Sequence, residues 1–416
     1  MNLDRLVPGA WALTRTAASA VSAPVTVPAL TAAAMHTARR AALRIDRFGE
    51  HLHAVAEDRP SPLPAPRTLR LPGRDRYVIT SDLHRCGPGA LDWPAHQRTD
   101  AVYPRLLEHY AEQGWHLIEN GDVEDLWMTG GSASGAVYDV SLLATGVTSL
   151  IDRRPSRSVL RAQLDRIVEN NAQIYGLLRE GFCADGRYHR TVGNHDDALT
   201  DDELVEHLAT SLPGLRAADT ILLDRPGATA ADGIAGVRAV IAHGHLTDSW
   251  NGPGFAALGR VITWLATAFG DLPWTPSLSD GAEEHAAARL LAGRGRNRLI
   301  SVDARYGGNR RFDSLDEERL FERLGREEPE GGWPWLLFGH THFPMLEPLD
   351  ASGRAVRYAN SGCGVMPRTV TALEWDPADE ERPVRVVAWT ADRSVTGGTG
   401  VERVELRPDG RYLGPV

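Results

Sequence analysis

The sequence predicts an α/β fold in which short buried strands alternate with helices. Apolar runs such as Tyr77-Val78-Ile79-Thr80 are strand-like, and stretches such as 101–113 and 158–179 have helical apolar spacing. Five of the predicted strands end in clusters rich in Asp, Asn or His. Because binding sites in layered α/β folds collect at the carboxyl ends of strands, we expect these clusters to meet.

The alternation runs from residue 77 to residue 345 and is followed by a β-rich segment. The strands that we predict in the first part are 77–80, 115–118, 188–192, 237–242 and 333–337. Beyond Pro344, further short strands are predicted over 355–359, 371–375 and 384–389. These later strands are candidates for a second sheet that closes the domain.

The chain divides by composition into an extension, a linker and one main domain. Residues 1–57 form a predicted N-terminal helical extension, 58–70 a Pro-rich linker, and 71–416 the main domain. A helical insert, 246–332, interrupts that domain. An apolar stripe marks the helix of the extension, at Ala41, Ile45, Phe48, Leu52 and Val55. We favour docking of this helix on the main domain over an interfacial or partner-binding role.

Bulk composition describes an ordinary globular chain of 416 residues, with 42% apolar and 24% charged residues. Its formal net charge of -10 disfavours a surface that grips nucleic acid or an anionic membrane. Three cysteines are not a disulfide framework, so we expect reduced thiols and a cytoplasmic protein. The uncharged stretch 16–36 is too weakly apolar and too broken by proline for a spanning helix, and peripheral membrane association through it is the alternative.

The segment Phe338-Gly339-His340-Thr341-His342 contains two histidines at positions i and i+2. On an extended backbone these two imidazoles face the same way, so both can bind one site at the mouth of a buried strand. The alternative is that His340 and His342 are packed core histidines. Asp82 and His84 repeat the same spacing after the strand that begins at Tyr77.

Together the clusters supply a mixed set of oxygen and nitrogen donors rich in imidazole: Asp82, His84, Asp122, Asn194, His243, His340 and His342. Such a set suits Mn, Fe, Zn, Co or Ni better than Mg or Ca. Seven donors exceed one tetrahedral site but fit two divalent transition metal ions that share a bridging carboxylate, about 3.5–4 Å apart. A bridging hydroxide is then the expected nucleophile, and Mn²⁺ is the ion that we favour for assay.

Five ordered motifs resemble those of the calcineurin-like metallophosphoesterases across residues 76–345. They are Asp82-x-His84, Gly121-Asp122-x-x-Asp125, Gly193-Asn194-His195-Asp196, His243-Gly244-His245 and Gly339-His340-Thr341-His342. The resemblance implies a layered α/β/β/α sandwich with two central sheets flanked by helices. Residues 1–70 and the insert lie outside it.

The resemblance also implies a role for each motif residue. One metal would be held by Asp82, His84 and His342, the other by Asn194, His243 and His340, and Asp122 would bridge them. The catalytic pair would be His195, facing the phosphate or leaving group, and Asp125, which orients its ring. Asp125 is alternatively a helix N-cap, and His245 competes with His243 as the ligand.

Two departures from the family pattern bear on the subclass. Ser361 and Cys363 differ from the family's Asn-Pro-Gly-Ser turn in the segment Asn360-Ser361-Gly362-Cys363. Leu126-Trp127 follows Asp125, where the protein Ser/Thr phosphatase branch has Arg. This resembles instead the branch of nucleotide-sugar lipid pyrophosphatases and small phosphodiesterases.

The predicted function is therefore a metal-dependent hydrolase that cleaves a phosphodiester, phosphomonoester or pyrophosphate bond in a small molecule. A nuclease of the same fold is one alternative, which the acidic charge disfavours. A non-catalytic metal-binding scaffold is the other, although every motif position is filled. For the insert we predict a cap beside the site that sets substrate choice, against a purely stabilising role.

Overall fold

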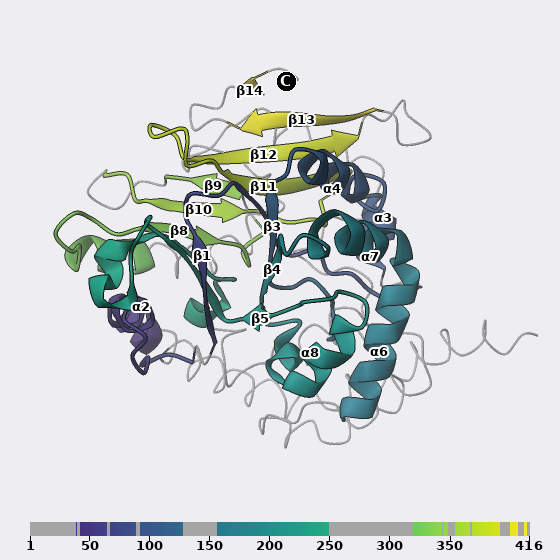
Figure 1. The fold of residues 1–416 in the computed structure, drawn as a ribbon, viewed down its shortest axis with the longest axis horizontal. Helices are drawn as coiled ribbons and strands as arrows, with labels where there is room; N and C mark the ends of the chain where they lie inside the picture. The colour runs from purple at the N-terminus through teal and green to yellow at the C-terminus, as the bar shows by residue number, and fades with distance from the viewer. Residues whose placement is uncertain are drawn as a thin grey trace, which may run out of the picture.

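The computed structural model describes residues 39, 42–64, 67–88, 92–127, 156–248, 319–342, 344–347, 354–366, 368–391, 400–406 and 412–413. Its described strands form two mixed sheets, and helices flank them (Figure 1). This confirms the α/β class that the alternation predicts. None of the helices within the described residues is long and apolar enough to cross a membrane.

The first sheet is six-stranded within the described residues and runs in the order β1-β6-β7-β8-β10-β9. Its strands are β1 Thr68–Pro72, β6 Thr220–Asp224, β7 Val237–Ile241, β8 Trp335–Phe338, β10 Tyr358–Ser361 and β9 Pro344–Leu346. Strands β7, β8 and β10 are parallel neighbours. Their carboxyl ends therefore share one edge, where the Gly-His-Thr-His segment follows β8.

The second sheet is eight-stranded within the described residues and runs in the order β14-β13-β12-β11-β2-β3-β4-β5. Its strands are β14 Tyr412–Leu413, β13 Val401–Leu406, β12 Val384–Ala391, β11 Thr369–Trp375, β2 Tyr77–Thr80, β3 His116–Asn120, β4 Tyr188–Thr191 and β5 Ala217–Ala218. Strands β2 to β5 are parallel, and β11 to β14 are antiparallel. Strands β11 to β14 thus extend the sheet of β2 to β5, whereas the predicted strand 355–359 corresponds to β10 in the first sheet, so the predicted later strands do not form one sheet of their own.

Helices cover the outer side of each sheet, and Figure 1 shows α4, α6, α7 and α8 on the opposite side of the molecule from α2. The helices with defined bounds are α2 Phe48–Ala56, α3 Trp93–Gln97, α4 Tyr103–Glu112, α6 Arg157–Asn170, α7 Ala172–Leu178 and α8 Asp202–Ala209, and residues 319–326 are also helical. Asp201 caps α8 by accepting a hydrogen bond from the Glu203 N–H. The shorter helical turns are η3 Arg179–Cys183, η4 Asp197–Thr200, η5 Ala230–Gly236 and η6 His245–Thr247.

The buried apolar residues form separate clusters on the faces of the sheets. One contains Leu106, Leu164 and Leu178 from the helices over the second sheet. Another joins residues of both sheets, such as Ile79 and Ile241, so the two sheets share a core. A third packs α2 on the first sheet. Burial on both faces explains why β2 and β7 are apolar almost without interruption.

The predicted helix 158–179 is interrupted in the structure at Asn171, between α6 and α7. The Asn171 side chain donates to the carbonyl oxygens of Ile167 at 2.8 Å and Cys86 at 3.2 Å. It thereby competes with the regular helix hydrogen bonds. Strand β1 begins at Thr68, within the stretch that the composition assigns to the linker. Strands β6 and β13 lie outside the strands predicted from the sequence.

Several sequence predictions fall on residues outside the described ranges. They concern the stretch 16–36, most of the insert 246–332, and the first part of the predicted N-terminal helix. The cap hypothesis therefore stays a prediction.

Candidate metal centre

The predicted donors lie just beyond the carboxyl ends of five strands. Asp82 follows β2, Asp122 follows β3 and Asn194 follows β4, and these strands are parallel neighbours. His243 and His340 follow β7 and β8, which are parallel neighbours in the other sheet. The fold thus brings the motifs of both sheets to one region.

The backbone at this edge is unusual, because many donor residues have positive φ angles. Five of the nine non-glycine residues with positive φ in the described chain are site residues: Asp82, His84, Asp122, His340 and His342. Such conformations are uncommon and concentrate at functional sites. Gly121, with φ +75°, lets the chain pass the His243 ring, because a Cβ there would lie 2.6 Å from that ring.

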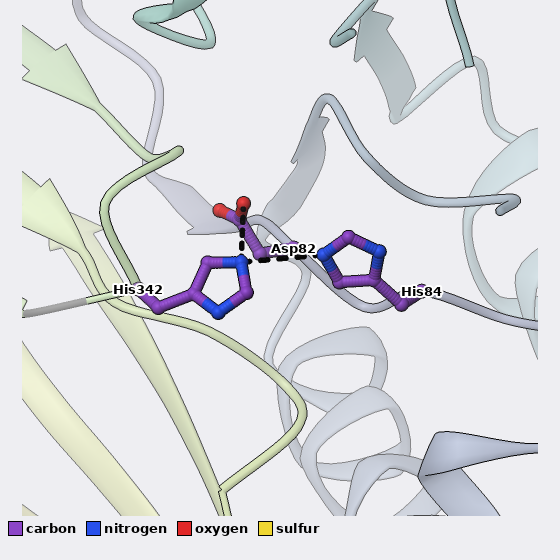
Figure 2. Close-up of side chains that lie close together, drawn as sticks. All are labelled: Asp82, His84 and His342. Atoms are coloured by element: carbon purple, nitrogen blue, oxygen red, sulfur yellow. Dashed lines mark hydrogen bonds and ion pairs between the residues drawn. The ribbon is translucent and has the colours of Figure 1, made fainter. Parts of the chain in front are cut away.

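The first group of donors is Asp82, His84 and His342, whose ligand atoms lie within 4.8 Å of one another. Figure 2 shows His342 Nε2 between its two partners, 3.2 Å from Asp82 Oδ1 and 3.3 Å from His84 Nε2. Asp82 is fully buried, and within the described residues its Oδ1 atom has no hydrogen-bond partner. A buried carboxylate oxygen of this kind, facing two imidazole nitrogens, fits a cation.

The second group is Asp122, His243 and His340, also within 4.8 Å. His243 Nε2 lies 3.2 Å from Asp122 Oδ2 and 3.2 Å from the Asn194 side-chain oxygen. Asp122 belongs to a further group with His84 and His195. Asp122 therefore lies in the second group and, through this further group, beside His84 of the first group.

In two of the donor histidines, His84 and His243, the Nδ1 atom contacts an oxygen atom. His84 Nδ1 lies 2.9 Å from Asp125 Oδ2, and His243 Nδ1 donates to the Asn120 carbonyl oxygen at 2.8 Å. Both rings therefore present Nε2 toward the donor groups. Fixing the tautomer in this way is characteristic of metal-binding imidazoles.

Asp125 contacts His195 as well as His84. Its Oδ2 atom lies 2.9 Å from His195 Nδ1, and Trp127 stacks on the His195 ring with centroids 4.2 Å apart. The His195 backbone N–H donates to Asp122 Oδ1 at 2.8 Å. His195 is thus oriented from three sides and, with its side chain 13% exposed, it borders solvent.

The charges within the cluster shift the protonation equilibria strongly. Burial alone lowers the pKa of His195, but the carboxylates of Asp125 and Asp122 outweigh it and raise the pKa to about 9. The same balance, with Asp122 and Asp82 as partners, raises the pKa of His243 to about 10. Burial raises the pKa of Asp82, but His243 and His342 outweigh it and lower the pKa to about 2. The buried carboxylates therefore stabilise positive charge at this position, as a bound metal cation requires.

A fully buried network of charged side chains lies beneath the donor loops. Arg85 pairs with Glu119 and Glu124, and Arg190 pairs with Glu124 and Asp196. Asp196 accepts from the Gly193 N–H at 2.6 Å and from the Val123 N–H at 3.1 Å. It therefore connects the loop that carries Asp122 to the loop that carries Asn194.

His243 and His245 were competing candidates for the same ligand position. Within the described residues, His243 lies in a donor group and His245 lies in none. Arg85, next to His84, is buried and paired with carboxylates. Cys86 is buried and its thiol donates to the His84 carbonyl oxygen. Asn360 donates to the Gly339 carbonyl oxygen at 2.7 Å and so supports the Gly-His-Thr-His segment.

Three further residues at or below the site, Asp248, Asp196 and Arg190, have no role among those predicted from the sequence. Asp248 lies 2.7 Å from His340, and Asp196 and Arg190 lie in the network below the site. Asp196 stands inside the Gly-Asn-His-Asp motif, which was the available signal.

No family model matches this chain, and no curated protein matches it.

Proposed function

We propose that this chain is a metal-dependent hydrolase of small-molecule phosphate esters, built as a metallophosphoesterase-type sandwich. The observation that carries the proposal is the convergence of the seven predicted donors from five strand ends. Six of them lie in donor groups that are linked through His84 and Asp122, and the Asn194 side-chain oxygen lies 3.2 Å from His243 Nε2. Asp82, His84 and His342 would hold one divalent transition metal ion. Asn194, His243 and His340 would hold a second, with Asp122 common to both.

Ions bound there would act as Lewis acids on water and on the phosphoryl oxygens. The remaining work falls to the chain itself. His195 faces the same cluster, its Nδ1 is held by Asp125 and its ring is packed against Trp127. Nε2 is therefore the nitrogen available to donate a proton to a leaving-group oxygen or a hydrogen bond to the phosphoryl group.

The proposal is tested by hydrolysis of bis-p-nitrophenyl phosphate and p-nitrophenyl phosphate in the presence of Mn²⁺. We expect turnover of at least one ester, and the ratio of the two rates separates diesterase from monoesterase activity. Metal-loaded protein that hydrolyses neither ester would support the scaffold alternative.

His195→Ala assigns the activity to this site. We expect turnover to fall roughly 10²–10⁴-fold while bound metal stays at the wild-type level. His207→Ala is the matched control, because His207 also pairs with an aspartate, Asp165 at 2.7 Å, but belongs to none of the donor groups. Loss of metal in His195→Ala would instead make His195 a ligand, which its position near Asp122 and His84 permits.

A further inference from the structure

Asp248 forms a close pair with one of the candidate ligands. Its Oδ2 atom lies 2.7 Å from His340 Nε2, and the side chains are only 9% and 12% exposed. Asp248 follows the short turn η6, where its N–H donates to the His245 carbonyl oxygen at 3.2 Å. Its position is thus fixed by the same loop that carries His243.

The nitrogen of His340 that is engaged differs from that of its neighbours. His84 and His243 are held through Nδ1 and present Nε2 toward the donor groups. His340 is held through Nε2 instead. A neutral imidazole carries one proton, so a ring that donates Nε2–H to a carboxylate keeps a lone pair on Nδ1.

We propose that Asp248 is a positioning residue that holds His340 as the Nε2–H tautomer and leaves Nδ1 to bind the cation of the second group. This inference rests on the proposed metal-dependent function and adds a residue to its site. Asp248 does for His340 what Asp125 does for His84 and what the Asn120 carbonyl does for His243. A carboxylate partner also makes the ligating nitrogen more basic.

The pairing with Asp248 explains how the His340 ring is held in one tautomer, which the five motifs do not explain. His340 N–H already donates to Asp82 Oδ2 at 2.8 Å, which fixes the backbone but not the ring. The ring also contacts the His243 and His245 rings, with centroids 5.1 and 6.4 Å away, but ring packing does not determine which nitrogen carries the proton. Asp248 supplies that constraint at Nε2.

Two variants of the full chain test the assignment by Mn²⁺ titration calorimetry on metal-free protein. Asp248→Leu removes the acceptor and is expected to weaken Mn²⁺ binding roughly 10- to 100-fold. Asp248→Asn keeps an acceptor oxygen and is expected to retain most of the affinity. Asp165→Leu is the control, since Asp165 makes an equally short 2.7 Å contact with the Nε2 of His207 but is 67% exposed and outside the donor groups.

A second readout does not depend on either variant folding. Nitrogen chemical shifts of histidine-labelled wild-type protein, with His340→Gln to assign the resonance, report the tautomer directly. The assignment expects the Nε2–H form for His340, and the Nδ1–H form would overturn it. Wild-type Mn²⁺ affinity in a folded Asp248→Leu protein would also overturn it. So would an Asp248→Asn protein that loses as much Mn²⁺ affinity as Asp248→Leu, because the carboxylate would then bind the ion itself.

None of these measurements uses an ester. A protein that shows the Asp248 effect but hydrolyses no phosphate ester would overturn the proposed function alone. A protein that hydrolyses esters with the opposite His340 tautomer would overturn the role of Asp248 alone.

Discussion

Two buried networks in this molecule use the same chemistry in different places. Beneath the donor loops, Arg190 pairs with Glu124 and Asp196, and Tyr175 donates its hydroxyl to Glu124 at 2.5 Å. In the outer part of the second sheet, Arg403 binds Glu374 through two contacts of 2.8 and 2.6 Å. Tyr110 also donates to Glu374 there.

The difference is what each network holds in place. Glu124 and Asp196 are adjacent in sequence to Asp125 and His195, and both are fully buried. Glu374 and Arg403 instead lie within β11 and β13 and connect them to α4. The same ion-pair chemistry therefore fixes functional loops in one region and strands in the other.

The largest effect is expected from Arg190→Met, which breaks the network under the site. Removing one partner of a buried ion pair typically costs about 3–5 kcal/mol, because it leaves uncompensated charge. Asp196 loses its arginine and Glu124 keeps only the longer contact with Arg85, at 3.8 Å, so the loops that carry Asp122 and Asn194 should lose their fixed spacing. We expect a lower free energy of unfolding in urea together with weaker Mn²⁺ binding. Unchanged Mn²⁺ affinity in a destabilised Arg190→Met protein would contradict the claim that this network fixes the loops that carry the metal donors.

Arg403→Met is the matched change in the outer network. Its side chain is 14% exposed, so some solvation remains, and we expect a loss of about 1.5–3 kcal/mol in the free energy of unfolding. Mn²⁺ affinity at a temperature where the protein is folded should equal that of the wild type. If this variant also binds metal weakly, loss of stability alone explains both effects.

A histidine pair lies at the amino ends of β3 and β4, the ends away from the donor loops. Unlike the ion pairs, this pair should make stability depend on pH in the mildly acidic range. His116 Nδ1 lies 3.1 Å from His189 Nε2, and burial, then the neighbouring His116, lowers the pKa of His189 to about 4. An unfolded histidine titrates near 6.5, so the unfolded state binds the proton first as the pH falls. Stability should decline between pH 6.5 and 4, by at most about 3 kcal/mol from this group. Urea unfolding of wild type and His189→Phe across this range measures it, and an equal slope in both proteins would exclude His189 as the cause.

The smallest effects should come from the tyrosines. Tyr175→Phe and Tyr110→Phe each remove one hydroxyl donor to a buried carboxylate, which should cost about 1.5 kcal/mol in unfolding free energy. The losses should be similar, because the two networks are alike in chemistry. Only Tyr175→Phe should weaken Mn²⁺ binding, and a parallel loss in Tyr110→Phe would show that the networks are not distinct.

The sequence predicted what depends on local pattern. Strand β2 has the predicted bounds, β7 and β8 lie within a few residues of theirs, and the donor residues lie at the expected strand ends. The break at Asn171 was not predictable from apolar spacing, because it depends on a side chain that bonds to Cys86, far away in the chain. Asp248 and Arg190 were missed for the same reason, since their partners His340 and Glu124 are 92 and 66 residues away.

Metal content is the most direct test of the account. Elemental analysis of the full chain purified without chelator should approach two transition metal ions per chain. Asp122→Asn should lower the content of both sites, because Asp122 lies in the second donor group and also in a group with His84, a donor of the first. Wild-type protein that binds no transition metal, or an Asp122→Asn protein that retains two ions, would contradict a shared metal centre at these strand ends.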